Sequence, residues 1–176
     1  GRDDGARINT DGKARPTMKQ VIDQPLSDAQ IDVMREKDPR YIEAQNLLER
    51  ARERNGKGLT AKSQSASKQF FQESIGHYEN LRQLADRVSA EEKAQPVIVR
   101  RVAAFKEMVT DEMVETYINL AAVDASRTSY PSASQTIAAG LKRVPGNARL
   151  ESYREQILMN QALSSSDSGR WRRGRK

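Results

Sequence analysis

Residues 117–147 read YINLAAVDASRTSYPSASQTIAAGLKRVPGN, and this stretch carries most of the information about the fold. Ala133, Ile137 and Gly140 recur at a spacing of three to four residues, so on a helix they share one stripe. Small side chains at Ala121, Ala133 and Gly140 allow two helix backbones to approach closely. The stretch therefore predicts two short helices packed against each other.

Bulky residues and a proline turn complete this pattern. Tyr117 lies three residues before Leu120, and these side chains are expected to fill the space between the two helices. Pro145 cannot continue a helix, and Gly146-Asn147 supplies the turn that begins the next one. We therefore expect an antiparallel helix pair followed by a third helix.

This spacing resembles the tetratricopeptide (TPR) repeat, a helix–turn–helix unit of about 34 residues. It departs from that family at Asp124, where an aromatic residue is usual. The resemblance implies an all-α fold, built as a short stack of antiparallel helix pairs in a TPR-like α-solenoid. It also implies that a partner binds along the concave face formed by the first helices, at Glu115, Ile118, Asn119, Ala122 and Ser126. Only Asn119 corresponds to the residues with which some TPR proteins grip a C-terminal carboxylate, so that mode of recognition is not implied.

A fainter copy of the second-helix spacing lies upstream, at Tyr41, Ala44, Leu48 and Ala51. It is either a second repeat or the chance result of an amphipathic helix. Because one repeat cannot bury its own faces, further helix pairs are expected beside the first.

The chain divides into three parts. Residues 1–25 are expected to form a disordered polar arm, residues 26–162 a TPR-like helical domain, and residues 163–176 a flexible Ser-rich linker with a basic tail. Expected helices cover residues 27–37, 39 to about 55–58, 63–88, 96–109, from 111 onward, and 147–162. Ser89 with Glu92 is a possible capping box, and Thr110 a possible cap of the helix that follows it.

The net charge of +6 belongs to the two ends of the chain. Residues 1–19 carry +2 and residues 162–176 carry +4, whereas residues 20–161 contain 20 basic and 20 acidic side chains. The basic composition therefore gives no argument for nucleic acid binding through the folded surface.

The C-terminal end carries a candidate polyanion-binding segment: Arg170, Trp171, Arg172, Arg173, Arg175 and Lys176. Its cations can neutralise phosphates, while the indole can stack on a base or enter a lipid interface. A protein with an acidic groove, or no specific partner at all, are the alternatives.

The residues that would support catalysis are few. His77 is the only histidine and there is no cysteine, which excludes disulfides and makes a zinc site improbable. Gly56-Lys57-Gly58 lacks the spacing of a phosphate-binding loop. We therefore expect no enzyme activity, no metal and no cofactor.

The sequence favours a non-enzymatic scaffold or adaptor, an accessory subunit that binds another protein. A component of a ribonucleoprotein or nucleic acid assembly, anchored by the basic tails, is the alternative. There is no apolar run long enough for a transmembrane helix. The missing cysteine, the start at Gly1 and the polar leading arm together suggest the bacterial cell envelope (periplasm) rather than the cytoplasm.

Overall fold

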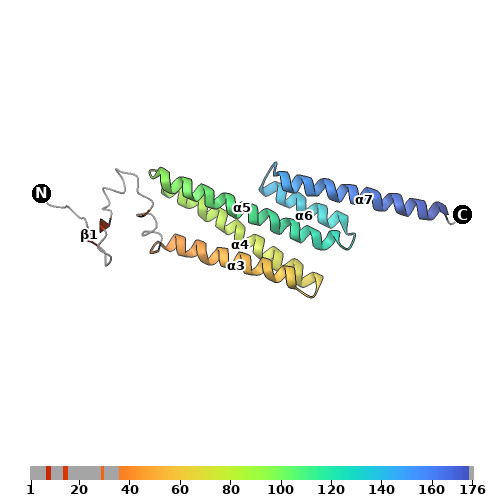
Figure 1. Ribbon diagram of the computed structural model, residues 1–176, viewed down its shortest axis with the longest axis horizontal. Coiled ribbons are helices and arrows are strands. Elements are labelled where there is room, and N and C mark those ends of the chain that lie inside the picture. Colours follow the sequence, from red (N-terminus) through yellow and green to blue (C-terminus); the bar gives the residue numbers. More distant parts are fainter. Residues whose placement is uncertain (1–6, 9–13, 16–28, 30–35, 175–176) are drawn as a thin grey trace. The chain divides into compact units, whose positions relative to one another are not determined.

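A computed structural model describes residues 7–8, 14–15, 29 and 36–174 of the chain (Figure 1). Two-residue strands β1 (Arg7–Ile8) and β2 (Ala14–Arg15) pair antiparallel within the arm, where no strand was expected. From residue 36 to residue 174 all regular structure is helical. The all-α class is therefore confirmed for the described part of the domain.

Five helices follow one another along this part of the chain: α3 (Pro39–Thr60), α4 (Gln64–Glu91), α5 (Pro96–Ala125), α6 (Tyr130–Arg143) and α7 (Ala148–Gly174). The helix expected over residues 27–37 lies mostly outside the described residues. The structure does describe its last two residues, Glu36 and Lys37, which form a turn before α3.

Helix α3 begins at Pro39, as expected for a proline in a first helical turn. The Asp38 carboxylate accepts a hydrogen bond from the Arg40 backbone N–H at 2.9 Å and caps that turn. The expected end near residues 55–58 is wrong, because α3 continues to Thr60. Gly58 marks a close approach: a Cβ there would lie 2.5 Å from the ring of Phe71 on α4.

The caps expected at Ser89 and Thr110 are also wrong. Ser89 lies inside α4, which runs to Glu91. Thr110 lies inside α5, a single helix of 30 residues that begins at Pro96. Thr110 lies within a continuous helix, so there is no first turn after it whose unpaired N–H groups its side chain could cap. Burial of Val109 and Met113 on either side of it favours the continuous helix.

The chain forms two compact units. The described part of unit 1 is residues 7–8, 14–15, 29, 36–48 and 80–109, and that of unit 2 is residues 49–79 and 110–174. The core of unit 1 is a cluster on α4 and α5, against which α3 side chains pack: Leu84, Ala85, Val88, Ile98 and Val102, with Ala44, Leu47 and Val97.

Unit 2 contains the helix pair expected from residues 117–147. Its buried side chains include Tyr117, Leu120, Ala121, Ala133 and Ile137, the residues of the expected contact. A Cβ at Gly140 would lie 3.1 Å from Tyr117 and 3.2 Å from Leu150, so the glycine lies at a close crossing between helices.

The turn between α6 and α7 also follows the sequence. Gly146 has a φ of +72°, a backbone conformation that favours glycine. Asn147 then caps α7, because its side-chain carbonyl accepts a hydrogen bond from the Leu150 N–H at 3.1 Å. The backbone of α7 is helical as far as Gly174, past the expected end near Ala162 and through the stretch expected to be a linker.

Candidate functional site: an apolar groove in unit 1

Unit 1 contains a groove of about 350 Å³ between segments of three helices. Ile42, Ala44 and Leu48 of α3 form one wall, and α4 and α5 form the rest. The full lining is Glu36, Arg40, Tyr41, Ile42, Ala44, Gln45, Leu48, Leu84, Ala85, Val88, Arg101, Val102 and Phe105. Most of these side chains are apolar, and a groove of this kind is typical of sites that accept a partner's apolar side chains.

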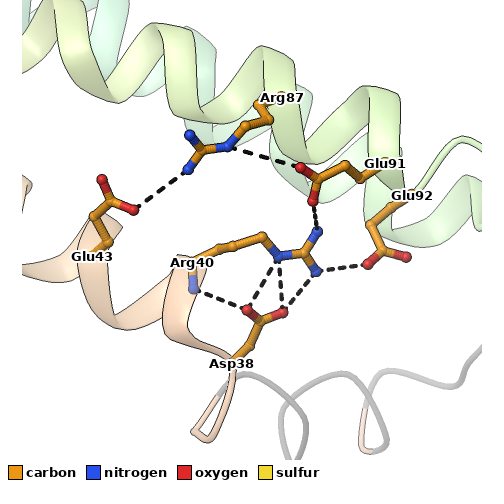
Figure 2. Close-up of polar contacts among 6 residues, drawn as sticks. All are labelled: Asp38, Arg40, Glu43, Arg87, Glu91 and Glu92. Atoms are coloured by element: carbon orange, nitrogen blue, oxygen red, sulfur yellow. Dashed lines mark hydrogen bonds and ion pairs between the residues drawn. The ribbon is translucent and has the colours of Figure 1, made fainter.

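Arg40 lies at the polar side of this groove and holds three carboxylates (Figure 2). Its guanidinium donates to Asp38 at 2.7 Å, to Glu91 at 2.7 Å and to Glu92 at 2.6 Å. These contacts tie the start of α3 to the end of α4.

Arg87 extends this network. Its guanidinium lies 3.5 Å from Glu43 and 3.9 Å from Glu91 (Figure 2). The six residues of Figure 2, which we call the Arg40 cluster, contain four carboxylates and two guanidiniums, so the cluster has a net charge of −2.

The hydrogen bond between Arg40 and Asp38 shifts the pKa of both partners. The Asp38 side-chain hydrogen bond raises the pKa of Arg40 above its ordinary value, against an opposing effect of burial. In return, the hydrogen bond from Arg40 holds the pKa of Asp38 below its ordinary value near 3.8. Both groups are therefore charged at neutral pH, and the ion pair that ties the start of α3 to the end of α4 is kept.

One wall of the groove carries the faint upstream spacing, which fits either a second repeat or the chance pattern of an amphipathic helix. Tyr41, Ala44 and Leu48 of that pattern all line the groove. The small side chain of Ala44 helps to leave the space open, as does Ala85 on α4. The spacing is visible in the sequence, but the groove also depends on α4 and α5 segments that are 36 or more residues away, since Leu84 follows Leu48 by 36 residues.

Of the residues expected on a concave face, Glu115, Ile118, Asn119 and Ala122 lie on α5 in unit 2, and Ser126 lies in the turn directly after that helix. Glu115 and Ser126 are exposed, whereas Ile118, Asn119 and Ala122 are partly buried. Asn119 is engaged within the unit, because its amide donates to the Asn55 side chain at 3.2 Å. The structure therefore brings Asn119 against α3, one of the chain's own helices.

Ile118 is the expected residue that borders a cavity. It lines a shallow cleft of about 410 Å³ together with the start of α7, at Ala148, Arg149, Ser152, Tyr153 and Gln156. Burial raises the pKa of the Tyr153 hydroxyl, which remains protonated at neutral pH. Glu115, Asn119, Ala122 and Ser126 are not among the residues of this cleft.

Asp124, where the chain departs from the TPR pattern, has a specific role in unit 2. Its side chain is only 5% exposed and accepts hydrogen bonds from Lys68 at 3.0 and 3.1 Å. The Gln64 amide donates to the same carboxylate at 3.4 Å. The acid therefore joins the end of α5 to the start of α4, a contact that an aromatic side chain could not make.

The candidate polyanion-binding segment, residues 170–176, begins at the end of α7. The backbone of residues 170–174 belongs to that helix. The side chains of these residues, and Arg175 and Lys176 as a whole, lie outside the described part of the structure.

His77 lies partly buried on α4. Among the described residues, no group of three or more histidines or carboxylates is placed to hold a metal ion. In the same part of the chain, no helix combines the length and the hydropathy needed to cross a membrane.

Comparison of the chain with protein-family profiles, with curated proteins and with solved structures gives no match.

Proposed function

We propose that the protein is a non-enzymatic scaffold or adaptor that binds another protein through the groove of unit 1. The observation that carries this proposal is the groove itself, with its apolar lining and a half-exposed Ile42 on its wall. Grooves between helices commonly accept the apolar face of an amphipathic helix. Ile42 is 47% exposed, so a partner that covers it removes apolar surface from water.

The chemistry of the partner follows from the lining of the groove. Of the Arg40 cluster only Arg40 lines it, and most of the other lining side chains are apolar, so unit 1 favours a segment that carries apolar anchors. The apolar lining provides most of the affinity once such a segment has docked.

The TPR-like architecture is part of the same proposal. The burial of Tyr117, Ala133 and Ile137 and the close crossing at Gly140 support a TPR-like pair made of α6 and the C-terminal half of α5. Helix α5 is longer than a TPR helix, since it begins at Pro96. The pair would then be one element of an irregular helical stack rather than of a regular array.

Site-specific photo-crosslinking tests the proposed function. A photoreactive phenylalanine at Gln45, which lines the groove, should give one discrete adduct in the native host, and the captured protein should bind the purified chain. Adduct and binding should both weaken in the Ile42→Gln variant and persist in Leu59→Gln. Leu59 is the matched control because it is an exposed leucine on the same helix, 63% exposed, outside the groove. Equal adducts in the two variants would contradict the proposal.

A further inference from the structure

Helix α7 carries an exposed apolar patch in the middle of its length. Leu158 is 53% exposed, Met159 65% and Leu163 57%, and Ala162 between them is exposed as well. We call these four residues the α7 patch. In the described part of the chain, the other exposed large apolar side chains are scattered over α3 and α5. The α7 patch is therefore the place where such side chains gather.

The α7 patch lies on the side of the helix that faces away from the core of unit 2. The core side of α7 is marked by Leu150 and Ile157, which are 0% and 2% exposed. At 3.6 residues per turn, the patch lies on the opposite side of the helix from these two residues. Nothing in the rest of unit 2 therefore needs the patch to be apolar.

The same face of α7 carries charges of opposite sign on the two sides of the patch. Glu151 and Glu155 are exposed and precede it by up to two turns, and Arg170 and Arg173 occupy helical positions two to three turns after it. By helical periodicity, these four positions and the patch fall within an arc of about 140°. The remaining charged residues of α7 fall outside this arc: Arg149, Arg154, Asp167 and Arg172. The face is therefore acidic, then apolar, then basic along the helix.

We propose that this face of α7 binds the same face of a second copy of the chain, with the two helices antiparallel. That arrangement brings the acidic end of each helix against the basic end of the other, whereas a parallel pair would bring like charges together. A face with this order of charges complements its own reverse, and this property identifies the occupant. The inference concerns unit 2 alone and goes beyond the proposed function of the groove.

The spacing of the charges fixes the centre of the pair. Glu151 and Arg173 are equally far from residue 162 in the sequence, and Glu155 and Arg170 are equally far from a point half a residue later. Ala162 therefore lies at the two-fold axis, where the same residue of both copies meets. Its small side chain allows the two backbones to approach closely, with the larger members of the α7 patch around it. The charges and the apolar residues thus indicate one register.

The two kinds of residue have different tasks in this contact. Burial of the α7 patch removes apolar surface from water and provides most of the affinity. Exposed ion pairs add little to affinity, but they select the direction and register of the helices. The acidic residues beside the patch also distinguish this face from helices that lie on lipid surfaces, whose polar face is rich in lysine and arginine. Because the contact is small, we expect a dissociation constant in the micromolar range.

Sedimentation equilibrium of the full chain between about 1 µM and 1 mM tests this inference. A reversible equilibrium between monomer and dimer is expected. Met159→Gln should raise the dissociation constant about 30-fold or more, because each dimer contains the change twice. The matched control is Leu59→Gln, since Leu59 is exposed to the same degree, 63%, and lies on α3. It should leave the dissociation constant unchanged, and circular dichroism should show both variants to be as helical as the parent.

A single introduced cysteine tests the two-fold axis, because the chain has no cysteine of its own. Ala162→Cys should form a disulfide-linked dimer under mild oxidation, since a disulfide needs the two residues to lie within a few ångströms of each other. The control is Asn160→Cys, which is equally close to the centre along α7 but lies on the other side of the helix. That variant should crosslink far more slowly.

Reversal of charge tests the antiparallel direction. Glu155→Arg and Arg170→Glu should each raise the dissociation constant about four-fold or more, because each change turns two attractive pairs of the dimer into repulsive ones. The double variant restores both pairs with their signs exchanged. Its dissociation constant should return to within about two-fold of the parent value.

Each contrary result would overturn the inference. A chain that stays monomeric up to about 1 mM has no such contact. A dimer that Met159→Gln leaves intact forms through another surface, and equal crosslinking at residues 160 and 162 excludes the axis. A double charge variant that is weaker than either single one excludes the antiparallel pair. If the chain stays monomeric but binds vesicles of phosphatidylcholine and phosphatidylserine through Met159, the patch is a lipid-binding surface. None of these results bears on the groove of unit 1.

Discussion

Replacing Gly58 with alanine should destabilise the protein, whereas the same change at Gly56, two residues earlier on α3, should stabilise it. Both glycines lie inside the helix, where alanine is favoured over glycine by about 0.5–1 kcal/mol. At Gly56 nothing lies within 4 Å of the added Cβ, so that gain is realised in full. The two positions therefore share a helix and a substitution but differ in their surroundings.

At Gly58 the added Cβ would lie 2.5 Å from one ring carbon of Phe71 and 2.6 Å from a second. Contacts this short force the ring or the helix to move. Phe71 is buried, and inserting a methyl group into a packed core typically costs about 1–3 kcal/mol. After the helix-propensity gain, we expect Gly58→Ala to lose about 0.5–2 kcal/mol. Because both variants share that gain, they should differ by the packing cost alone, about 1–3 kcal/mol.

Urea unfolding followed by circular dichroism at the helix band measures the free energy of unfolding for each variant. The slope of the transition must stay constant for the comparison to hold. If Gly58→Ala stabilises the chain as much as Gly56→Ala does, the close approach of α3 and α4 at this point is wrong.

Three further predictions concern unit 2, acid stability and the C-terminal end. Tyr117→Ala should lower the free energy of unfolding by about 3–5 kcal/mol, because the ring is buried against Gly140, and a thermal melt within a degree or two of the parent would contradict this. Hydrogen bonds from Arg40 and Arg52 lower the pKa values of Asp38 and Glu112, so the two carboxylates stabilise the fold at neutral pH and lose this effect as the pH falls below about 4. Urea unfolding between about pH 7 and pH 2 measures this loss of stability. Arg52→Met should make the free energy of unfolding depend less on pH. A plot of log affinity for duplex DNA against log salt concentration should have a slope near −4 to −5 for the full chain, about −0.9 for each of five cations. Equally salt-dependent binding after removal of residues 164–176 would show that the folded surface carries a basic site.

The sequence predicted the parts of the fold that depend on neighbouring residues. Ala133, Ile137 and Gly140 define one stripe of α6, and Pro145 with Gly146 ends it, so these features follow from local spacing and backbone preference. The crossing at Gly140 could be expected because a residue without a side chain inside an apolar stripe indicates close packing.

The errors arose where distant residues decide the outcome. Gly58 was expected to help end a helix, yet it lies inside α3 at a place where Phe71 of α4 packs against it. Thr110 was expected to cap a new helix, and only the burial of its neighbours shows why α5 continues. Asp124 looked like a departure from a repeat, and its reason is Lys68, 56 residues earlier in the chain.

The groove of unit 1 belongs to the same class of features. Ile42, Leu84 and Val102 line one cavity, although they come from three helices and are separated by many residues in the sequence. Periodicity identifies the face of each helix that is buried, but not a place where three faces leave a gap.

The central claim is that this groove is the surface through which the protein binds its partner, and one affinity comparison tests it most directly. The protein captured by crosslinking at Gln45 is titrated against the parent chain, Ile42→Gln and Leu59→Gln by isothermal calorimetry. Burying a whole isoleucine contributes about 1.5–3 kcal/mol, and Ile42 is 47% exposed, so its loss should weaken binding about three- to ten-fold. We predict that the Leu59→Gln variant binds like the parent. Equal affinities for all three proteins would contradict the claim.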